Sequence, residues 1–375
     1  MTTVKYLGPY GDHSGYGEAT RNAIFALKTA NVDVITEKVG FTGKKFEAGI
    51  THEVSQSLEK KSGVYKIKIL HVTPDLYPNY IEKGKHNIGH LFWETDKLPA
   101  SWVAPCNKMD ELWTGTLYNA TVIKNSGVTV PIYVFPQSCD TNINTSRPFK
   151  LPGERRLTFY SIFEWNERKN PKALLEAYWK EFKNEKDVCL LLKVHKGDYE
   201  EEGFRQIRSD IMSWRASLGF DTYPDVFLCT RLLSRDEMQR LHATGDCFIS
   251  AHRGEGWGLP QVEATMANKP IISVRYGGVH EYLKSHNLFS VEYALVPVVK
   301  YFNKYYEPGM LWAEANEESL RKKMRQVHRI YTNPKTRRLL GLKSSSSKKI
   351  VKAQFSYEVV GQQMAYRLGE IDRKL

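Results

Sequence analysis

A glycine-rich segment between a short apolar strand and a helix most restricts the fold of this chain. Residues 247–249, CFI, form an apolar run typical of a buried strand, and the loop RGEGWG follows at residues 253–258. Pro260 then suits the first turn of a helix, where a backbone N–H has no intrahelical partner. Strand, glycine loop and helix in this order predict a parallel α/β sheet whose loop can approach a ligand closely.

Two glutamates accompany this loop. Glu255 lies within it, and Glu263 follows Pro260 in what the pattern predicts to be the first turn of the helix. Carboxylates only accept hydrogen bonds, so two of them beside an anion site favour a ligand that carries hydroxyl groups and phosphate. An ordinary strand-to-helix turn with a capping glutamate is the alternative that the loop alone leaves open.

Composition limits the class of protein. The 375 residues suffice for two domains with separate cores, and the net charge of +12 favours a polyanionic partner. No basic run is interleaved with aromatic residues, which disfavours nucleic acid and leaves phosphorylated small molecules or an anionic membrane surface. The denser basic zone at residues 321–352 fits either peripheral contact with such a membrane or a solvated helical surface.

Several signals favour a cytoplasmic enzyme without a metal centre. No apolar run approaches the length of a membrane span, and the N-terminus has neither a basic lead nor a long apolar core for export. The five cysteines are scattered and form no C-x-x-C pair, which indicates free thiols in a reducing compartment rather than disulfides or zinc ligands.

The first part of the chain reads as one α/β domain over residues 1–150. A strand at residues 4–7, a glycine loop, an amphipathic helix and a strand at 32–35 form a βαβ unit, in which Gly15 and Gly17 allow a phosphate to approach or simply form a tight turn. Further strands are expected at 67–73, 87–93, 112–114 and 132–135. Glu94 then emerges from the carboxyl end of one strand, where open parallel sheets place their sites.

A second alternating series follows a polar, proline-containing connection and gives a predicted domain at residues 151–354. Strands are expected at 157–162, 188–194, 226–229, 247–249 and 271–274, and helices at 171–182, 202–218 and 234–244. Residues 355–375 are expected to form a closing helix with apolar positions at Phe355, Val359, Met364 and Leu368, packed back on the first domain.

The segment EGWGLPQVEA at residues 255–264 resembles the signature of the family-4 retaining glycosyltransferases (group 1), in which seven residues separate two glutamates. The triplet RKN at 168–170 and SVRYGGVHEYL at 273–283 support this resemblance, which covers residues 156–285 well and the first domain more loosely. It implies the GT-B fold, an α/β architecture of two Rossmann-like, doubly wound domains that face each other across a cleft.

The resemblance also implies roles for the residues around the loop. Glu263 would accept hydrogen bonds from the ribose of a nucleotide, and Glu255 from the hydroxyl groups of the transferred sugar. The backbone of Gly258, Leu259 and Pro260 would meet the diphosphate at the start of the helix.

The remaining implied roles concern charge and the other domain. Lys169 would neutralise the diphosphate, and Arg168 would add a second positive charge, because Glu164 occupies the position where many relatives carry an arginine. Residues 229–232, including Arg231 and Leu232, lie where relatives hold the base. Gly15 and Gly17 would approach the donor phosphates, and Glu94 would orient the acceptor or sugar.

Together these features predict a retaining transfer of a hexose from a UDP- or GDP-sugar to a hydroxyl of a glycan, a glycolipid or a protein-linked sugar. No tightly bound cofactor is expected, and the absence of a D-x-D motif predicts activity without a metal. The alternatives are a nucleotide-sugar epimerase or phosphorylase of the same fold, and a non-catalytic protein that binds nucleotide sugar or nucleic acid.

Overall fold

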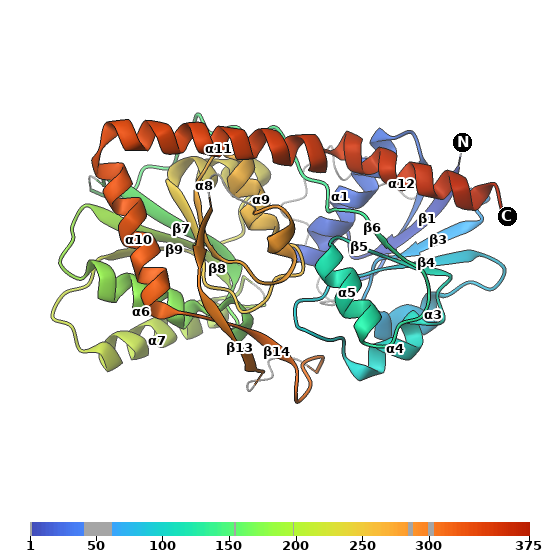
Figure 1. The fold of residues 1–375 in the computed structure, drawn as a ribbon, viewed down its shortest axis with the longest axis horizontal. Coiled ribbons are helices and arrows are strands. Elements are labelled where there is room, and N and C mark those ends of the chain that lie inside the picture. The colour runs from blue at the N-terminus through green and yellow to red at the C-terminus, as the bar shows by residue number, and fades with distance from the viewer. Residues whose placement is uncertain (1, 41–61, 154, 198, 284–287, 299–303) are drawn as a thin grey trace. The chain divides into compact units, whose positions relative to one another are not determined.

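The computed structural model describes residues 2–40, 62–153, 155–197, 199–283, 288–298 and 304–375, and the chain forms two compact units (Figure 1). Unit 1 comprises Met1–Thr141 and Val351–Leu375, and unit 2 comprises Asn142–Ile350. Each unit contains one six-stranded sheet. The chain passes between units after residues 141 and 350, a few residues before the boundaries expected from the sequence, after residues 150 and 354.

The sheet of unit 1 is entirely parallel and has the strand order β2-β1-β3-β4-β5-β6. Its strands are β1 (Thr3–Gly8), β2 (Asp33–Lys38), β3 (Ile67–Leu70), β4 (His86–His90), β5 (Glu111–Thr114) and β6 (Ile132–Val134). Its helices are α1 (Gly15–Thr29), η1 (Pro74–Leu76), α3 (Tyr77–Tyr80), α4 (Ala100–Cys106), α5 (Leu117–Asn125) and α12 (Tyr357–Asp372). Strands β3 and β5 are buried throughout, and their charged residues Lys68 and Glu111 pair with Glu82 and Arg367.

The C-terminal helix α12 completes the core of unit 1. Its buried side chains Val360, Met364, Leu368 and Ile371 lie in one cluster with apolar side chains of α1 and of the central strands. Residue 360 rather than the expected Val359 faces this core, because the buried positions 360, 364, 368 and 371 repeat at the spacing of one helix face.

Unit 2 repeats the design with the strand order β12-β11-β10-β7-β8-β9, again with every pair parallel. Its strands are β7 (Leu157–Glu164), β8 (Val188–His195), β9 (Asp225–Cys229), β10 (Cys247–Ser250), β11 (Ile271–Val274) and β12 (Leu288–Val291), with an antiparallel pair β13 (Tyr293–Pro297) and β14 (Leu311–Ala315). Its helices are η2 (Glu167–Lys169), α6 (Pro171–Phe182), α7 (Glu201–Leu218), α8 (Arg235–Thr244), α9 (Leu259–Met266), η3 (Gly277–Glu281), α10 (Glu317–Thr332) and α11 (Pro334–Phe355).

Local sequence explains several of these boundaries. Helix α8 begins after Ser234, which forms a capping box with Glu237, and Asn170 ends η2 in the left-handed conformation immediately before Pro171 begins α6. The predicted strand at 87–93 ends earlier, at His90, although the next three residues are buried. Trp93 instead anchors a loop, since its indole N–H donates to Thr95 and to the Lys97 carbonyl.

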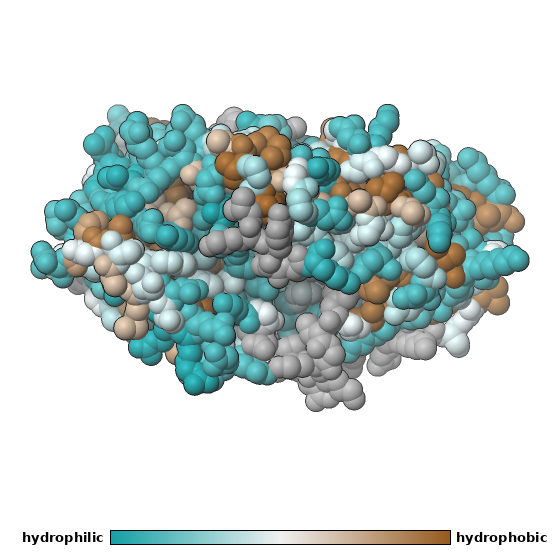
Figure 2. Space-filling model, turned by 90° about the horizontal axis from the view of Figure 1, so that it is seen from below, coloured by the Kyte–Doolittle hydropathy of each residue, from teal (hydrophilic) through white to brown (hydrophobic). Residues whose placement is uncertain are grey.

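Hydrophilic residues predominate on the face shown in Figure 2, where apolar residues form small, separate groups. Within the described part of the chain, no helix combines the length and apolar character that crossing a membrane requires.

The contact between α12 and α1 gives a test of the unit 1 core. A Cβ atom at Gly361 would lie 2.0 Å from the Ala26 carbonyl oxygen, whereas one at Gly369 of the same helix would meet nothing within 4 Å. Gly361→Ala should therefore destabilise the protein by about 1–3 kcal/mol through overpacking. Gly369→Ala should leave stability unchanged or raise it by up to about 1 kcal/mol.

Thermal unfolding of the two variants checks this expectation. Equal melting temperatures for Gly361→Ala and Gly369→Ala would show that α12 does not depend on the close approach to α1.

Candidate active site

The candidate site of unit 2 lies where the strand order of its sheet reverses. From the centre of this parallel sheet, β7, β8 and β9 follow one another toward one edge, and β10, β11 and β12 toward the other. The strand order therefore reverses between the neighbours β7 and β10. Ligands of open α/β sheets bind beside the carboxyl ends of the strands at such a point. The loops that leave these two strands, residues 165–170 and 251–258, carry the predicted charged residues.

Glu255, Lys169 and Arg168 form one ion cluster at this point. The Lys169 ammonium donates to Glu255 Oε1, and the Arg168 guanidinium lies 3.5 Å from Glu255 Oε2 and donates to the Gly254 carbonyl at 2.8 Å. The Glu255 side chain is only 9% exposed. The structure thus brings three of the predicted residues together, with a buried carboxylate between two cations.

Electrostatics holds this carboxylate in its charged form. Burial raises the pKa of Glu255, but the charges of Lys169 and Arg168 outweigh burial and lower the pKa to about 2. The neighbouring His252 is fully buried, and burial lowers its pKa to about 4. At neutral pH the cluster therefore holds one anion, two cations and a neutral imidazole.

Arg253 connects the two loops, a role that the sequence analysis missed. Its guanidinium donates to Glu314 Oε2 at 2.7 Å and to the Glu167 carbonyl and carboxylate at 2.8 Å. Its backbone N–H donates to the Arg168 carbonyl at 2.7 Å. Asn170 reaches the same Glu314 from the other side at 2.8 Å. These contacts fix the positions of Lys169 and Arg168 relative to the loop that carries Glu255. The local sequence does not indicate them, because Glu314 is far from both loops in the chain.

Glycines let a third loop pack directly on the Glu255 backbone. A Cβ atom at Gly278 would lie 1.9 Å from the Gly256 carbonyl oxygen, and one at Gly277, where φ is +82°, would lie 2.4 Å from that of Glu255. The Gly278 N–H donates to the Glu255 carbonyl at 2.7 Å. Their observed contacts are with protein backbone, so these two glycines support the shape of the loop.

Helix α9 begins at this loop and directs its N-terminus toward the same edge of the sheet. Gly258 is its N-cap with φ of +89°, and Leu259 and Pro260 are its first two residues. The N-terminal end of a helix carries partial positive charge, which adds to that of Lys169 and Arg168. The three predicted backbone positions therefore lie at an anion-attracting end.

Glu263 lies beyond the first turn of α9, which contains no acidic residue. The expectation that it falls in the first turn was wrong by one position, because the helix begins at Leu259. Its carboxylate is 32% exposed and lies 3.4 Å from Nε2 of the buried His242, whose Nδ1 contacts the Tyr160 hydroxyl at 2.9 Å. The buried His242 thus orients the Glu263 side chain, part of which remains exposed to solvent.

Comparison with known proteins concerns the family and the fold. Residues 154–327 match the family model described as glycosyl transferases group 1. This part of the chain belongs to the group 1 glycosyltransferase family. No curated protein sequence matches it.

Solved structures support the fold of this glycosyltransferase over its whole length. The Anabaena protein HepE in complex with UDP-glucose has a TM-score of 0.67 at 13% identity, covering 99% of this chain and 100% of that chain. Sucrose-phosphate synthase from Thermosynechococcus elongatus has a TM-score of 0.69 at 15% identity and covers 100% of both chains. A glycosyltransferase from Rickettsia africae has a TM-score of 0.68 at 15% identity, covering 99% and 98%. These likenesses establish the GT-B fold.

A hollow of about 260 Å³ lies at the carboxyl ends of β8 and β9 and contains one of the two predicted base-site residues. Arg231 lines it together with His195 and Tyr199. The Arg231 guanidinium also pairs with Glu237 at 2.5 Å, while Leu232 belongs to the same connection and is half-buried.

Lys193 is a second residue that the sequence analysis missed. It interrupts the apolar strand β8, is only 4% exposed, and places its ammonium 4.7 Å from the centre of the Tyr199 ring. Burial lowers its pKa to about 8. A lysine within an otherwise apolar strand is the signal that could have revealed it.

The predicted glycines of unit 1 follow β1, one of the two strands between which the strand order of this sheet reverses, whereas Glu94 follows β4. Gly15 and Gly17 are in the first turn of α1, but a Cβ atom at Gly17 would lie 2.2 Å from the Asp12 carbonyl oxygen, whereas one at Gly15 would meet nothing within 4 Å. Packing thus accounts for Gly17, and Gly15 has open space beside it. Glu94 is half-buried in the loop that Trp93 anchors after β4.

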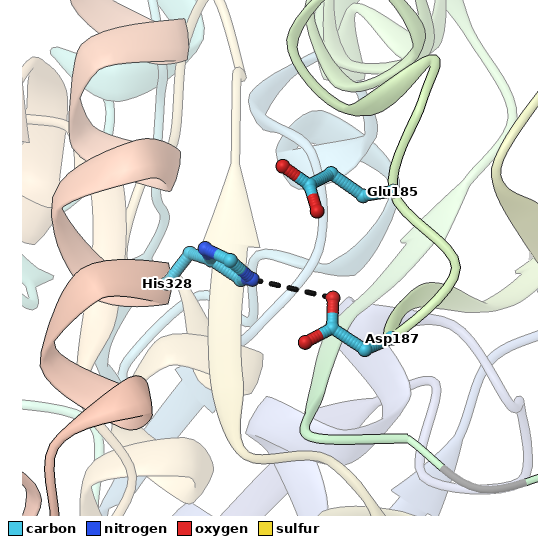
Figure 3. A group of neighbouring side chains, drawn as sticks. All are labelled: Glu185, Asp187 and His328. Atoms are coloured by element: carbon cyan, nitrogen blue, oxygen red, sulfur yellow. Dashed lines mark hydrogen bonds and ion pairs between the residues drawn. The ribbon is translucent and has the colours of Figure 1, made fainter.

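Among the described residues, one group has the composition of a metal site: Glu185, Asp187 and His328 (Figure 3). His328 points from α10 toward Asp187 at 3.4 Å. Arg325 already pairs with Glu185 at 2.9 Å and Arg156 with Asp187 at 3.2 Å. This cluster lies at the amino end of β8, opposite the edge that carries the candidate site, and acts as an ion network between α10 and the sheet.

The buried cluster makes a prediction about pH. The lowered pKa means that ionised Glu255 contributes stability above its ordinary pKa near 4.5, and that this contribution is lost as the pH falls toward about 2. Glu255→Gln should therefore lower stability at pH 7 by about 3 kcal/mol, the scale of a broken buried ion pair, and by progressively less below pH 4.5.

Melting temperatures of the wild type and Glu255→Gln between pH 3 and pH 8 provide the measurement. Glu202→Gln, which removes a carboxylate that is 60% exposed, serves as the control and should have little effect at any pH. A difference between wild type and Glu255→Gln that stays constant over this range would contradict the assignment of a charged, paired Glu255.

Proposed function

We propose that this glycosyltransferase transfers a hexose from a UDP-sugar to an acceptor hydroxyl, with retention of configuration at the anomeric carbon and without a metal ion. The observation that carries the proposal is the buried Glu255 between Lys169 and Arg168 beside the N-terminus of α9. The HepE structure with UDP-glucose supports uridine diphosphate as the leaving group.

The ion cluster suits both parts of such a donor. As the bond between the anomeric carbon and the diphosphate breaks, negative charge grows on the leaving group, and Lys169, Arg168 and the start of α9 lie together at the position that can stabilise it. Glu255 Oε1 and Oε2 each face one cation, so the carboxylate stays ionised and can accept hydrogen bonds from sugar hydroxyls.

Accessible polar groups nearby suit the nucleoside. Glu263, held from behind by His242, is proposed to accept the ribose hydroxyls through its exposed part. The backbone of residues 229–232, with Arg231 and Leu232, is proposed to hold the base at the hollow beside β8 and β9. Glu263 lies near the start of α9, and residues 229–232 lie at and after the carboxyl end of β9. Both are therefore at the same edge of the sheet as Lys169.

In the proposed reaction the acceptor oxygen forms a bond to the anomeric carbon on the face from which the diphosphate departs. The bond between that carbon and the phosphate oxygen breaks, and the leaving phosphate takes the acceptor proton. Glu94 in unit 1 is proposed to orient the acceptor or sugar, and Gly15, which has open space beside it, to allow the donor phosphates near the start of α1. The acceptor is a hydroxyl of a glycan, glycolipid or protein-linked sugar.

Lys169→Ala should reduce transfer by about 10²–10³-fold, the range measured when one preorganised donor to a developing oxyanion is removed. Lys172→Ala is the matched control, since Lys172 is 57% exposed, lies three residues away and pairs with Glu176. Release of UDP from UDP-glucose, with and without candidate acceptors, gives the rate. Equal activity of the two variants at matched melting temperatures would refute the role of Lys169.

Donor turnover is also expected to persist after removal of divalent cations. Lys169, Arg168 and the α9 terminus supply the positive charge that a bridging metal provides in D-x-D enzymes, and the sequence has no D-x-D motif. Turnover measured before and after EDTA treatment should agree within about two-fold. Loss of a catalytic metal would raise the barrier by several kcal/mol and reduce turnover far more. Complete loss with EDTA and recovery with Mg²⁺ or Mn²⁺ would overturn the metal-independent mechanism.

A further inference from the structure

The last part of unit 2 carries a strong excess of positive charge. Between Glu318 and Glu358 the sequence contains twelve lysines and arginines and no aspartate or glutamate. Some of these cations are paired with acidic residues: Arg321 and Arg325 with Glu181, and Arg337 with Asp246 at 3.5 Å. The others point outward, and most of them lie on α11 (Figure 1).

Helix α11 has two opposite faces within unit 2. Its inner face packs through Leu340 and Ser344, which are buried. At 100° per residue, the outer face is a stripe that we call the α11 outer face. It consists of Lys335, Arg338, Leu339, Leu342, Lys343, Ser346, Lys349 and Ile350, all exposed. Among the described residues, no acidic side chain forms an ion pair with these four cations.

Apolar side chains interrupt the charge on this face. Leu339 is 52% exposed, Leu342 61% and Ile350 47%, so all three belong to the most exposed large apolar residues of the described chain. A helix that presents leucine and isoleucine among lysines to solvent, with no acidic residue, has the composition of a helix lying in a membrane interface. A solvated helix would place polar residues at these positions.

A groove opens beside the α11 outer face. It has a volume of about 550 Å³ and lies between α10, α11 and the edge strand β12. Its walls combine apolar residues, among them Phe289, Ile330 and Leu339, with polar ones that include Lys323 and Lys343. Apolar walls with lysines beside them match the acyl chain and the anionic headgroup of a lipid.

We propose that the α11 outer face and this groove dock unit 2 on an anionic lipid bilayer, with α11 parallel to the membrane surface. Lys335, Arg338, Lys343 and Lys349 attract the anionic headgroups, and the three exposed apolar side chains enter the boundary between headgroups and acyl chains. A nucleic acid or another soluble polyanion would satisfy the cations but would leave these apolar side chains in water. The inference concerns a surface remote in sequence from Glu255 and does not depend on the identity of the donor.

Vesicle flotation tests the proposal with the full-length protein. Vesicles of phosphatidylcholine alone and of phosphatidylcholine with 30% phosphatidylglycerol are mixed with protein, and the floated fraction is measured at low and high salt. We expect flotation with the anionic vesicles only, and a reduction of about ten-fold at 1 M salt, where the Debye length falls to about 3 Å.

Two variants separate the charged and apolar contributions. Lys335→Glu/Arg338→Glu/Lys349→Glu should abolish flotation, and Leu339→Ser/Leu342→Ser should reduce it by about ten-fold, because shallow insertion depends on buried apolar area. The matched controls are Lys172→Glu/Arg205→Glu/Arg208→Glu and Met212→Ser, which change exposed residues of α6 and α7. Both controls should float like the wild type, and all variants should retain its melting temperature and its UDP release from UDP-glucose.

Absence of flotation with anionic vesicles would overturn the proposal, as would equal flotation of the α11 variants and their controls. Binding to polyphosphate or DNA that competes with vesicles and is unaffected by Leu339→Ser/Leu342→Ser would instead identify a site for soluble polyanions. Because UDP release is measured separately, failure of membrane docking remains distinguishable from failure of the proposed transferase activity.

Discussion

The active-site end of unit 2 depends on one buried carboxylate that stays ionised. Glu255 would be costly to bury as an anion, and Lys169 and Arg168 make its burial possible while they in turn are held close together. Arg253 ties the two loops that carry these charges. Because β7 and β10 are neighbours in the sheet, the loops that follow them lie side by side. The sheet topology thus explains where the ion cluster forms.

This cluster also defines what a ligand must do on entering. If the donor binds as proposed, its diphosphate would compete with Glu255 for Lys169, because both cations already pair with this carboxylate. Sugar hydroxyls can then satisfy the carboxylate oxygens that the cations release. The donor would thereby replace the ion pairs of Glu255 with its own charge-assisted hydrogen bonds to the carboxylate and the cations. No buried charge would be left without a partner.

Much of this organisation was predictable from sequence, because local signals specify it. Apolar runs identified the parallel strands, the capping box at Ser234 marked α8, and the motif carrying Glu255 indicated both fold and family, which the comparisons confirm. The Arg253–Glu314 contact and the packing of Gly278 on Gly256 were not predictable, since each joins segments far apart in the chain. The edge strand β12 and the pair β13 and β14 were also missed, being partly exposed and weakly patterned.

The origin of unit 1 from both ends of the chain has a consequence for synthesis. Strands β1 to β6 are made before unit 2, but Val360, Met364, Leu368 and Ile371, which complete their core, are made after it. Unit 2 is continuous from residue 142 to residue 350 and can fold while these residues are still being added. Until α12 is made, the apolar side chains of α1 that it covers stay exposed, and exposed apolar surface of this kind promotes aggregation.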